Sequence, residues 1–239
     1  MSDYRVVVYT SDRYQLSIRK FARLFNELWS KDQQVLVAGF TKPDFVLPSN
    51  FEFHSIGKPE DYPVQKWSNS LIDLFKQIDD EVFVFMGEDY LIADKVDIEG
   101  VQTLVDYANA NSSVIRIDLT LDRWGQLTRD GYPYTLFQVG NLNMFIATSQ
   151  APYSLSVTTS IWRKENILKF LEPDWDPWEV ETKGSNLVNV NSSGMNLFVY
   201  GTEKLIVPTN NGIHHTIVDE CLNQLLSEYE QEGDWKTHE

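Results

Sequence analysis

Short, uninterrupted apolar runs that alternate with amphipathic stretches constrain the fold of this chain most. The runs Val6–Tyr9, Val35–Ala38 and Val82–Met86 contain no polar residue apart from the tyrosine hydroxyl. Runs this short are typical of strands buried on both faces of a sheet. Residues 16–28 and 71–78 lie between these runs in the sequence, and each segment places apolar side chains at helical spacing among polar ones,. Strands and helices in this alternation predict an α/β fold with a mostly parallel sheet flanked by helices.

The second half of the chain is patterned less regularly. Gly, Asn, Thr, Tyr and Pro are frequent over residues 119–155, which predicts loops with short embedded strands,. The other expected elements are a helix over 101–108, a strand over 114–117, a β-like segment over 156–162, helices over 165–171 and 178–187, and closing strands over 197–200 and 205–207.

The chain has 239 residues, which is enough for one large domain with a substantial core,. The sequence contains no internal repeat, no low-complexity tract and no linker. We therefore expect a single domain over residues 1–226, followed by an acidic tail over residues 227–239.

The charge balance is strongly acidic, with 20 Lys and Arg against 35 Asp and Glu and a formal net charge of -15. Proteins that grip phosphate backbones do so with cations, so this balance argues against nucleic-acid binding as the main function. Net charge does not say where the charges lie, however. A nucleic-acid acceptor is therefore disfavoured but not excluded.

Two further features bear on the compartment. The single cysteine, Cys221, excludes an internal disulfide and any CxxC site, and it favours a reducing environment,. The first residues show no basic region before an apolar one, and no apolar run approaches the roughly 20 residues of a spanning helix,. We expect a cytoplasmic protein without a membrane span.

Familiar phosphate and hydrolase motifs are missing: the sequence has no GxGxxG, no P-loop, no HExxH and no GxSxG,. Ligands of open α/β sheets bind at the carboxyl ends of the strands, so the residues that directly follow each strand matter most. Thr10, Ser11 and Asp12 follow the first strand. They are suited either to cap the next helix, through Ser11 or Asp12, or to contact a nucleotide.

An acidic pair, Glu88-Asp89, follows the apolar strand that ends near Gly87. A carboxylate at the end of a buried strand needs a compensating partner unless it faces water. Mg²⁺ or Mn²⁺ is a suitable partner, since both take oxygen ligands and bridge to substrate phosphates. The alternative is that the chain has left the sheet at this point and both acids are solvated.

Several short pieces together resemble the nucleotide-sugar glycosyltransferases of the GT-A fold, in particular a branch found in phage and bacterial surface-glycan clusters. The pieces are Thr10-Ser11-Asp12, Trp67-Ser68, the strand that ends in Gly87-Glu88-Asp89-Tyr90, Ser160-Ile161-Trp162-Arg163-Lys164 and Pro177-Trp178-Glu179-Val180-Glu181. The acidic motif departs from the family's Asp-x-Asp. The resemblance implies a GT-A-like, Rossmann-related single domain.

The resemblance also implies roles for individual residues. Asp89 would bind a Mn²⁺ or Mg²⁺ ion that bridges the diphosphate, and Glu88 would support that ion or contact the ribose or the donor sugar. His214 or His215 would be an additional metal ligand. The residues implied in donor binding are Thr10, Ser11, Asp12, Trp67, Ser68, Glu88 and Arg163. Without the resemblance, Ser68 suits a helix N-cap, and Arg163 suits an exposed charged position that opens a helix.

A base for the acceptor hydroxyl is expected from Glu179 or Glu181. Residues two apart on a helix do not share a face, so only one of them should point at the site. By resemblance Glu179 is the first choice and Glu181 the second, with Trp178 stacking on a sugar or raising the carboxyl pKa. The alternative is a helix start with acids near its N-terminus and Trp178 in the core.

We thus expect a metal-assisted, inverting transfer of a sugar from a nucleotide donor, a UDP-sugar by preference, to a hydroxyl acceptor such as a glycan. One alternative is a sugar-phosphate nucleotidyltransferase, although the Gly-rich basic loop that usually opens such enzymes is missing. Another is an inactive module on the same fold that binds a glycan or a protein.

Overall fold

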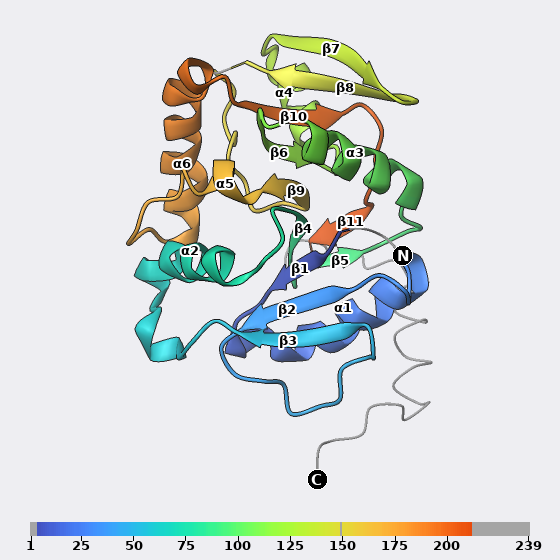
Figure 1. Ribbon diagram of the computed structural model, residues 1–239, viewed down its shortest axis with the longest axis vertical. Helices are drawn as coiled ribbons and strands as arrows, with labels where there is room; N and C mark the ends of the chain where they lie inside the picture. The colour runs from blue at the N-terminus through green and yellow to red at the C-terminus, as the bar shows by residue number, and fades with distance from the viewer. Residues whose placement is uncertain (1–3, 149, 212–239) are drawn as a thin grey trace.

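The computed structural model describes residues 4–148 and 150–211. Within them, nine strands form one sheet in the order β3-β2-β1-β4-β9-β6-β10-β8-β7, and β5 pairs with β11 in a separate two-stranded sheet (Figure 1). The strands are β1 (Val6–Tyr9), β2 (Val35–Gly39), β3 (Phe51–Ser55), β4 (Val82–Gly87), β5 (Tyr90–Ile92), β6 (Val114–Asp118), β7 (Tyr134–Val139), β8 (Leu142–Ala147), β9 (Ser160–Arg163), β10 (Phe198–Thr202) and β11 (Thr209–Asn211). The helices are α1 (Gln15–Leu28), α2 (Trp67–Gln77), α3 (Ile98–Ala110), α4 (Asp122–Asp130), α5 (Lys164–Ile167) and α6 (Pro177–Asn191).

The first four strands of the large sheet are parallel. The chain runs from β1 outward through β2 to β3, and then returns to place β4 on the other side of β1. The strand order therefore reverses between β1 and β4. In an open α/β sheet, the carboxyl ends of two such strands form the crevice that receives ligands.

Helices cover both faces of the sheet (Figure 1). Val6, Val8, Val84 and Met86 point to the face that α1 and α3 cover, and their apolar side chains join one buried cluster. The alternate residues of the same strands point to the other face, where α2, α5 and α6 pack. The uninterrupted apolar runs are thus explained by two covered faces.

The other half of the sheet is mixed. Strand β9 is antiparallel to both of its neighbours, β4 and β6, and β8 is antiparallel to both β10 and β7. All the other strands of this sheet run in one direction. The predicted mostly parallel α/β sheet flanked by helices is confirmed, with β9 inserted between its two parallel parts.

The structure corrects four sequence-based boundaries. Residues 119–155 hold the expected short strands, β7 and β8, but also the unexpected helix α4. The β-like segment over 156–162 is a strand only from Ser160 onward, and the helix expected over 165–171 is the short α5. Residues 205–207 form no strand; the last described strand, β11, follows them at Thr209–Asn211.

Some expectations concern parts of the chain beyond this description. The acidic tail over residues 227–239 and the end of the predicted domain at residue 226 lie outside the described residues. None of the described helices combines the length and the apolar character that crossing a lipid bilayer requires.

Candidate active site

The carboxyl ends of β1 and β4, where the strand order reverses and which we call the crevice, bring two sequence-predicted segments together,. Tyr9 of β1 pairs with Gly87 of β4, and the Glu88 amide donates to the Tyr9 carbonyl at 3.3 Å. Thr10 leaves β1 at the same edge, and its amide donates to the Ala38 carbonyl of β2 at 2.9 Å. The two segments predicted to contact a nucleotide and a metal are therefore neighbours.

The acidic pair has no basic partner in the part of the chain that the structure describes. Glu88 is only 8% exposed and Asp89 is half-buried, and no lysine or arginine among the described residues forms an ion pair with either. Burial raises the pKa of Glu88 to about 8; its own backbone amide opposes the rise, and the nearby charge of Asp89 adds to it. Burial also raises the pKa of Asp89, against the effect of its own amide.

The turn after β4 folds the Asp89 side chain back over the strand. A Cβ at position 87 would lie 2.7 Å from the Asp89 carboxylate, so glycine is required there for this approach. The described residues contain no cluster of three or more His, Cys, Asp or Glu side chains that could enclose a metal. A buried Glu88 and a half-buried Asp89 fit a Mg²⁺ or Mn²⁺ ion that keeps water and substrate phosphates as its other ligands,.

The segment after β1 does not cap a helix with its side chains. Neither Ser11 nor Asp12 accepts a capping hydrogen bond, so the capping alternative is wrong. Instead Asp12 accepts from the amide of Thr41 at 3.0 Å and from its hydroxyl at 2.7 Å. Asp12 thus ties the ends of β1 and β2 together at the rim of the crevice.

The start of α2 also reaches this crevice. The Trp67 ring meets the edge of Tyr9 at 5.3 Å between centroids, and Trp67 is half-buried. Ser68 is fully buried, and its hydroxyl accepts a 3.0 Å hydrogen bond from the Trp175 amide. Lys66, not Ser68, occupies the N-cap position of α2, which corrects the capping alternative for Ser68. The hydroxyl of Ser68 instead holds the loop that leads into α6.

The structure corrects the role predicted for Arg163. This residue pairs with Val82 at the amino end of β4, opposite the end that carries Glu88. Its guanidinium donates to the Ala108 carbonyl at 2.9 Å and lies 3.7 Å from Glu81. Arg163 therefore fixes helix α3 to the sheet and does not reach the crevice. The other two residues predicted near the metal, His214 and His215, lie outside the described residues.

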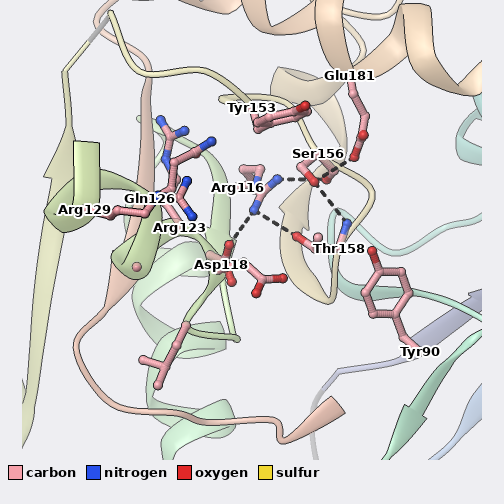
Figure 2. A pocket seen from close by; sticks show the side chains of 13 residues that line it. Tyr90, Arg116, Asp118, Arg123, Gln126, Arg129, Tyr153, Ser156, Thr158 and Glu181 are labelled. Atoms are coloured by element: carbon pink, nitrogen blue, oxygen red, sulfur yellow. Dashed lines mark hydrogen bonds and ion pairs between the residues drawn. The ribbon is translucent and has the colours of Figure 1, made fainter. Parts of the chain in front are cut away.

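A second feature lies beside the crevice. A cavity of about 430 Å³ opens at the carboxyl end of β6 (Figure 2). It is lined by Tyr90, Arg116, Asp118, Leu121, Asp122, Arg123, Gly125, Gln126, Arg129, Tyr153, Ser156, Thr158 and Glu181. Because Tyr90 directly follows Asp89, the cavity adjoins the acidic turn.

Glu181 points from α6 into this cavity (Figure 2). Its Oε1 accepts from the Ser156 hydroxyl at 2.8 Å and from the Val157 amide at 3.0 Å. Its Oε2 makes no hydrogen bond within the described residues. A carboxylate held by one oxygen and open at the other is arranged to accept a proton from a bound hydroxyl.

A buried ion pair supports this arrangement. The Arg116 guanidinium donates to Asp118 at 2.9 Å, to the Ser156 carbonyl at 2.8 Å and to the Thr158 hydroxyl at 3.3 Å. Both partners of the pair are almost fully buried. Sequence analysis missed them, although a charged pair at alternate positions of the apolar run 114–118 was a visible signal. The pair fixes the loop that holds Glu181.

The structure places Glu179 elsewhere. Its carboxylate accepts from the Asp176 amide at 3.2 Å and pairs with Lys183 at 2.6 Å, and the Asp176 side chain accepts from the Glu179 amide at 2.8 Å. This reciprocal capping box starts α6,. Glu179 does not line the cavity, whereas Glu181 does. Trp178 is 73% exposed, so its alternative placement in the core is wrong.

Tyr90 links the acidic turn to the cavity. Burial raises the pKa of its phenol, as do the nearby charges of Asp89, Glu181 and Asp122, while Arg116 opposes them. The Tyr90 hydroxyl therefore stays protonated and can donate a hydrogen bond.

Comparison with known proteins bears on the fold. No family model matches the chain, and no curated protein matches it. Among solved structures, UTP-bound UGPase from Acinetobacter baumannii aligns over 97% of this chain and 94% of its own, with a TM-score of 0.50 and 10% identity. An active-site mutant of the galactosyltransferase LgtC aligns over 98% and 97%, with a TM-score of 0.47 and 12% identity.

A third structure, TarS from S. aureus, aligns over 95% of this chain and 70% of its own, with a TM-score of 0.47 and 13% identity. The fold is an α/β sheet flanked by helices that resembles the fold of the UGPase structure. At these identities the likeness concerns the fold alone, since one fold supports many chemistries.

Proposed function

We propose that this protein is a glycosyltransferase that moves a sugar from a nucleoside diphosphate donor, by preference a UDP-sugar, to a hydroxyl acceptor. The observation that supports the proposal is the Glu88–Asp89 pair, which lies at the crevice where the strand order reverses and has no basic partner among the described residues. A bound cation beside an anionic ligand would compensate that pair.

On the donor side, Thr10, Ser11 and Asp12 would line the nucleotide, with Trp67 against the base or the sugar. Glu88 and Asp89 would hold the Mg²⁺ or Mn²⁺ ion. When bound, such an ion supplies positive charge next to the diphosphate that leaves.

On the acceptor side, Glu181 would act as the general base. A hydroxyl bound in the cavity gives its proton to Oε2 of Glu181, and its oxygen forms a bond to the anomeric carbon. The bond from that carbon to the β-phosphate oxygen breaks, and the nucleoside diphosphate leaves with the electron pair. Direct displacement of this kind inverts the anomeric configuration.

Hydrogen bonds to Oε1 give Glu181 a fixed orientation for this step. Ser156 and the Val157 amide hold the carboxylate, and the Arg116–Asp118 pair holds Ser156. A base whose position is fixed before the substrate arrives loses less entropy in the transition state.

A thermal-shift screen of the full chain tests the proposal, using UDP, UDP-glucose, GDP and CMP with and without MnCl₂. A nucleotide that binds only the folded protein raises its stability by about 2.7 kcal/mol at 100 times its Kd. We expect a shift with a uridine nucleotide that is larger with Mn²⁺ and is lost in Asp89→Asn. If none of the nucleotides shifts the wild-type midpoint, the proposal is wrong.

Two assays separate the alternatives. A nucleotidyltransferase would release pyrophosphate from UTP and glucose 1-phosphate, whereas a glycosyltransferase would release UDP from UDP-sugar and acceptor. A module that only binds glycans would retain its glycan affinity in Asp89→Asn and release no UDP.

A further inference from the structure

Helix α4 presents cationic and amide side chains to the cavity. Arg123, Gln126 and Arg129 follow one another at intervals of three residues, which keeps them on neighbouring positions of one helix face,. All three line the cavity, and Figure 2 shows them together on the side away from Tyr90. In a chain with a net charge of -15, this is an unusual local concentration of arginine.

Arg123 carries a charge that no carboxylate neutralises within the described residues. It is only 2% exposed, and its guanidinium donates to the Pro152 carbonyl and to the Ser154 hydroxyl at 3.0 Å, both of them neutral acceptors. Burial, together with the nearby charge of Arg116, lowers the pKa of Arg123 to about 9, although the charge of Asp118 opposes this effect. A buried cation without a partner is costly, and a bound anion would offset that cost.

The other charges of the cavity do not supply that anion. Arg116 and Asp118 neutralise each other at 2.9 Å. Asp122 acts electrostatically on Tyr90 and on Asp118, and it forms no ion pair with Arg123 among the described residues. Arg129 is exposed and pairs with its neighbour Asp130 at 2.8 Å. An exposed pair of this kind is weak, so Arg129 is free to exchange its partner for a ligand.

We propose that the acceptor carries an oxyanion, either a carboxylate or a phosphate, and that the α4 side of the cavity binds it through Arg129 and Gln126 in the field of Arg123. This inference rests on the proposed function. Arginine is suited to the task because its planar fork matches both oxyanions with two hydrogen bonds.

The acceptor, not the donor, is the molecule that reaches α4. The donor residues Thr10, Asp12, Glu88 and Asp89 lie along the crevice, and none of them lines the cavity. Glu181 has to touch the acceptor hydroxyl, and it lines the same cavity as Arg129. A sugar whose hydroxyl meets Glu181 would therefore extend its substituents toward α4.

Isothermal titration of the full chain, saturated with UDP and MnCl₂, tests this inference with matched ligands. Methyl glucuronide is compared with methyl glucoside, and glycerol 3-phosphate with glycerol, so the two oxyanions are examined separately. We expect at least one charged ligand to bind about tenfold more tightly than its neutral counterpart, as one charge-assisted hydrogen bond provides. Added NaCl should reduce the difference.

The variant Arg129→Gln should remove that preference, and it should fold normally because Arg129 is exposed. Arg5→Gln is the matched control, since Arg5 also pairs with an aspartate, Asp80 at 3.3 Å, but precedes β1 at the opposite end of the sheet. Arg5→Gln should keep the wild-type preference for the charged ligand.

Two outcomes overturn the inference. If charged and neutral acceptors bind equally while UDP binds with Mn²⁺, the oxyanion site is wrong and the proposed function stands. If Arg129→Gln instead weakens UDP-glucuronic acid relative to UDP-glucose, the oxyanion belongs to the donor sugar and the acceptor assignment is wrong. If the wild type binds no UDP at all, the result counts against the proposed function itself.

Discussion

The Ser156 hydroxyl donates a 2.8 Å hydrogen bond to Oε1 of Glu181, and this bond joins the loop before β9 to helix α6. Arg116 of β6 also holds this loop, because its guanidinium donates to the Ser156 carbonyl. The second oxygen of Glu181, Oε2, has no partner within the described residues. The hydrogen bonds to Oε1 therefore orient the carboxylate and leave Oε2 able to accept a proton.

Glu181→Gln is expected to lower turnover by roughly 10²–10⁴-fold, because an amide cannot accept the proton of the acceptor hydroxyl. Glu179→Gln should leave turnover near the wild-type value, since Glu179 caps α6 outside the cavity. UDP release measured for both variants side by side decides between the two glutamates. A larger loss in Glu179→Gln would restore the order predicted from sequence.

Ser156→Ala is expected to lower kcat by about tenfold with little change in the KM of the donor, because Glu181 would keep only the Val157 amide as a partner,. Steady-state kinetics with the UDP-sugar varied at fixed acceptor measures both constants. An unchanged kcat would show that the orientation of Glu181 does not limit the reaction.

Glu88→Gln is expected to stabilise the metal-free protein at neutral pH while weakening nucleotide binding. The change removes a buried acid that has no basic partner among the described residues, and about 1 kcal/mol would raise the thermal midpoint by roughly 2–4 °C in a chain of this size,. Thermal denaturation with and without UDP and MnCl₂ measures both effects. A variant that is less stable and still binds UDP normally would show that Glu88 has a structural role only.

Truncation of two tryptophans should change the free energy of unfolding by very different amounts. Trp178→Ala should change the free energy of unfolding by less than about 0.5 kcal/mol, because the side chain is 73% exposed,. Trp162→Ala should cost about 3–5 kcal/mol, since Trp162 is fully buried and stacks on Phe85 at 4.4 Å,. Urea denaturation compares them. A large loss for Trp178→Ala would mean that its ring is covered in solution.

Asp97 is expected to stabilise the start of α3 in a pH-dependent way. Its carboxylate accepts from the Gly100 amide at 3.0 Å and pairs with Lys204 at 2.5 Å. Burial alone would raise the pKa of Asp97, but Lys204 and the Gly100 amide outweigh it and lower the pKa below 3.8. The stabilisation is therefore full above this value and is lost as the pH falls through the lowered pKa.

Asp97→Ala should cost about 1–2 kcal/mol at pH 7. Asp97→Asn should cost less, because asparagine still caps the helix but cannot pair with Lys204. Urea denaturation at pH 7 and at pH 3 measures both variants. A cost for Asp97→Ala that is equal at the two pH values would contradict the role of the carboxylate charge.

Sequence pattern was sufficient where structure is local and periodic. Strands β1, β2 and β4 and helices α1, α2 and α3 follow from apolar spacing, because two covered faces demand it. Helix α4 was missed since Leu127 is its only buried apolar side chain, while the buried Arg123 reads as a polar, exposed residue in the sequence. Burial of a charged side chain depends on acceptors elsewhere in the fold.

The residues of the crevice could be predicted from the sequence, but those of the cavity could not. The place of Glu88 and Asp89 follows from where their strand ends, and Thr10 follows from the same rule,. The choice between Glu179 and Glu181 could not be made from a helical pattern, because it depends on Ser156, about 25 residues away in sequence and brought to α6 by tertiary packing. Arg163 was misplaced for a related reason, since β9 runs antiparallel to β4 and reverses which end its last residue meets.

The antiparallel strand β9 separates the part of the sheet that carries the crevice from the part that carries the cavity. Ser160 pairs with Phe85 on one side and with Asp118 on the other, so the segment that precedes β9 arrives at the same edge as the crevice. Insertions or deletions in that segment would remodel the cavity without disturbing β1 to β4. Under the proposed function, a lineage with this architecture can therefore acquire new acceptors while its donor site stays unchanged.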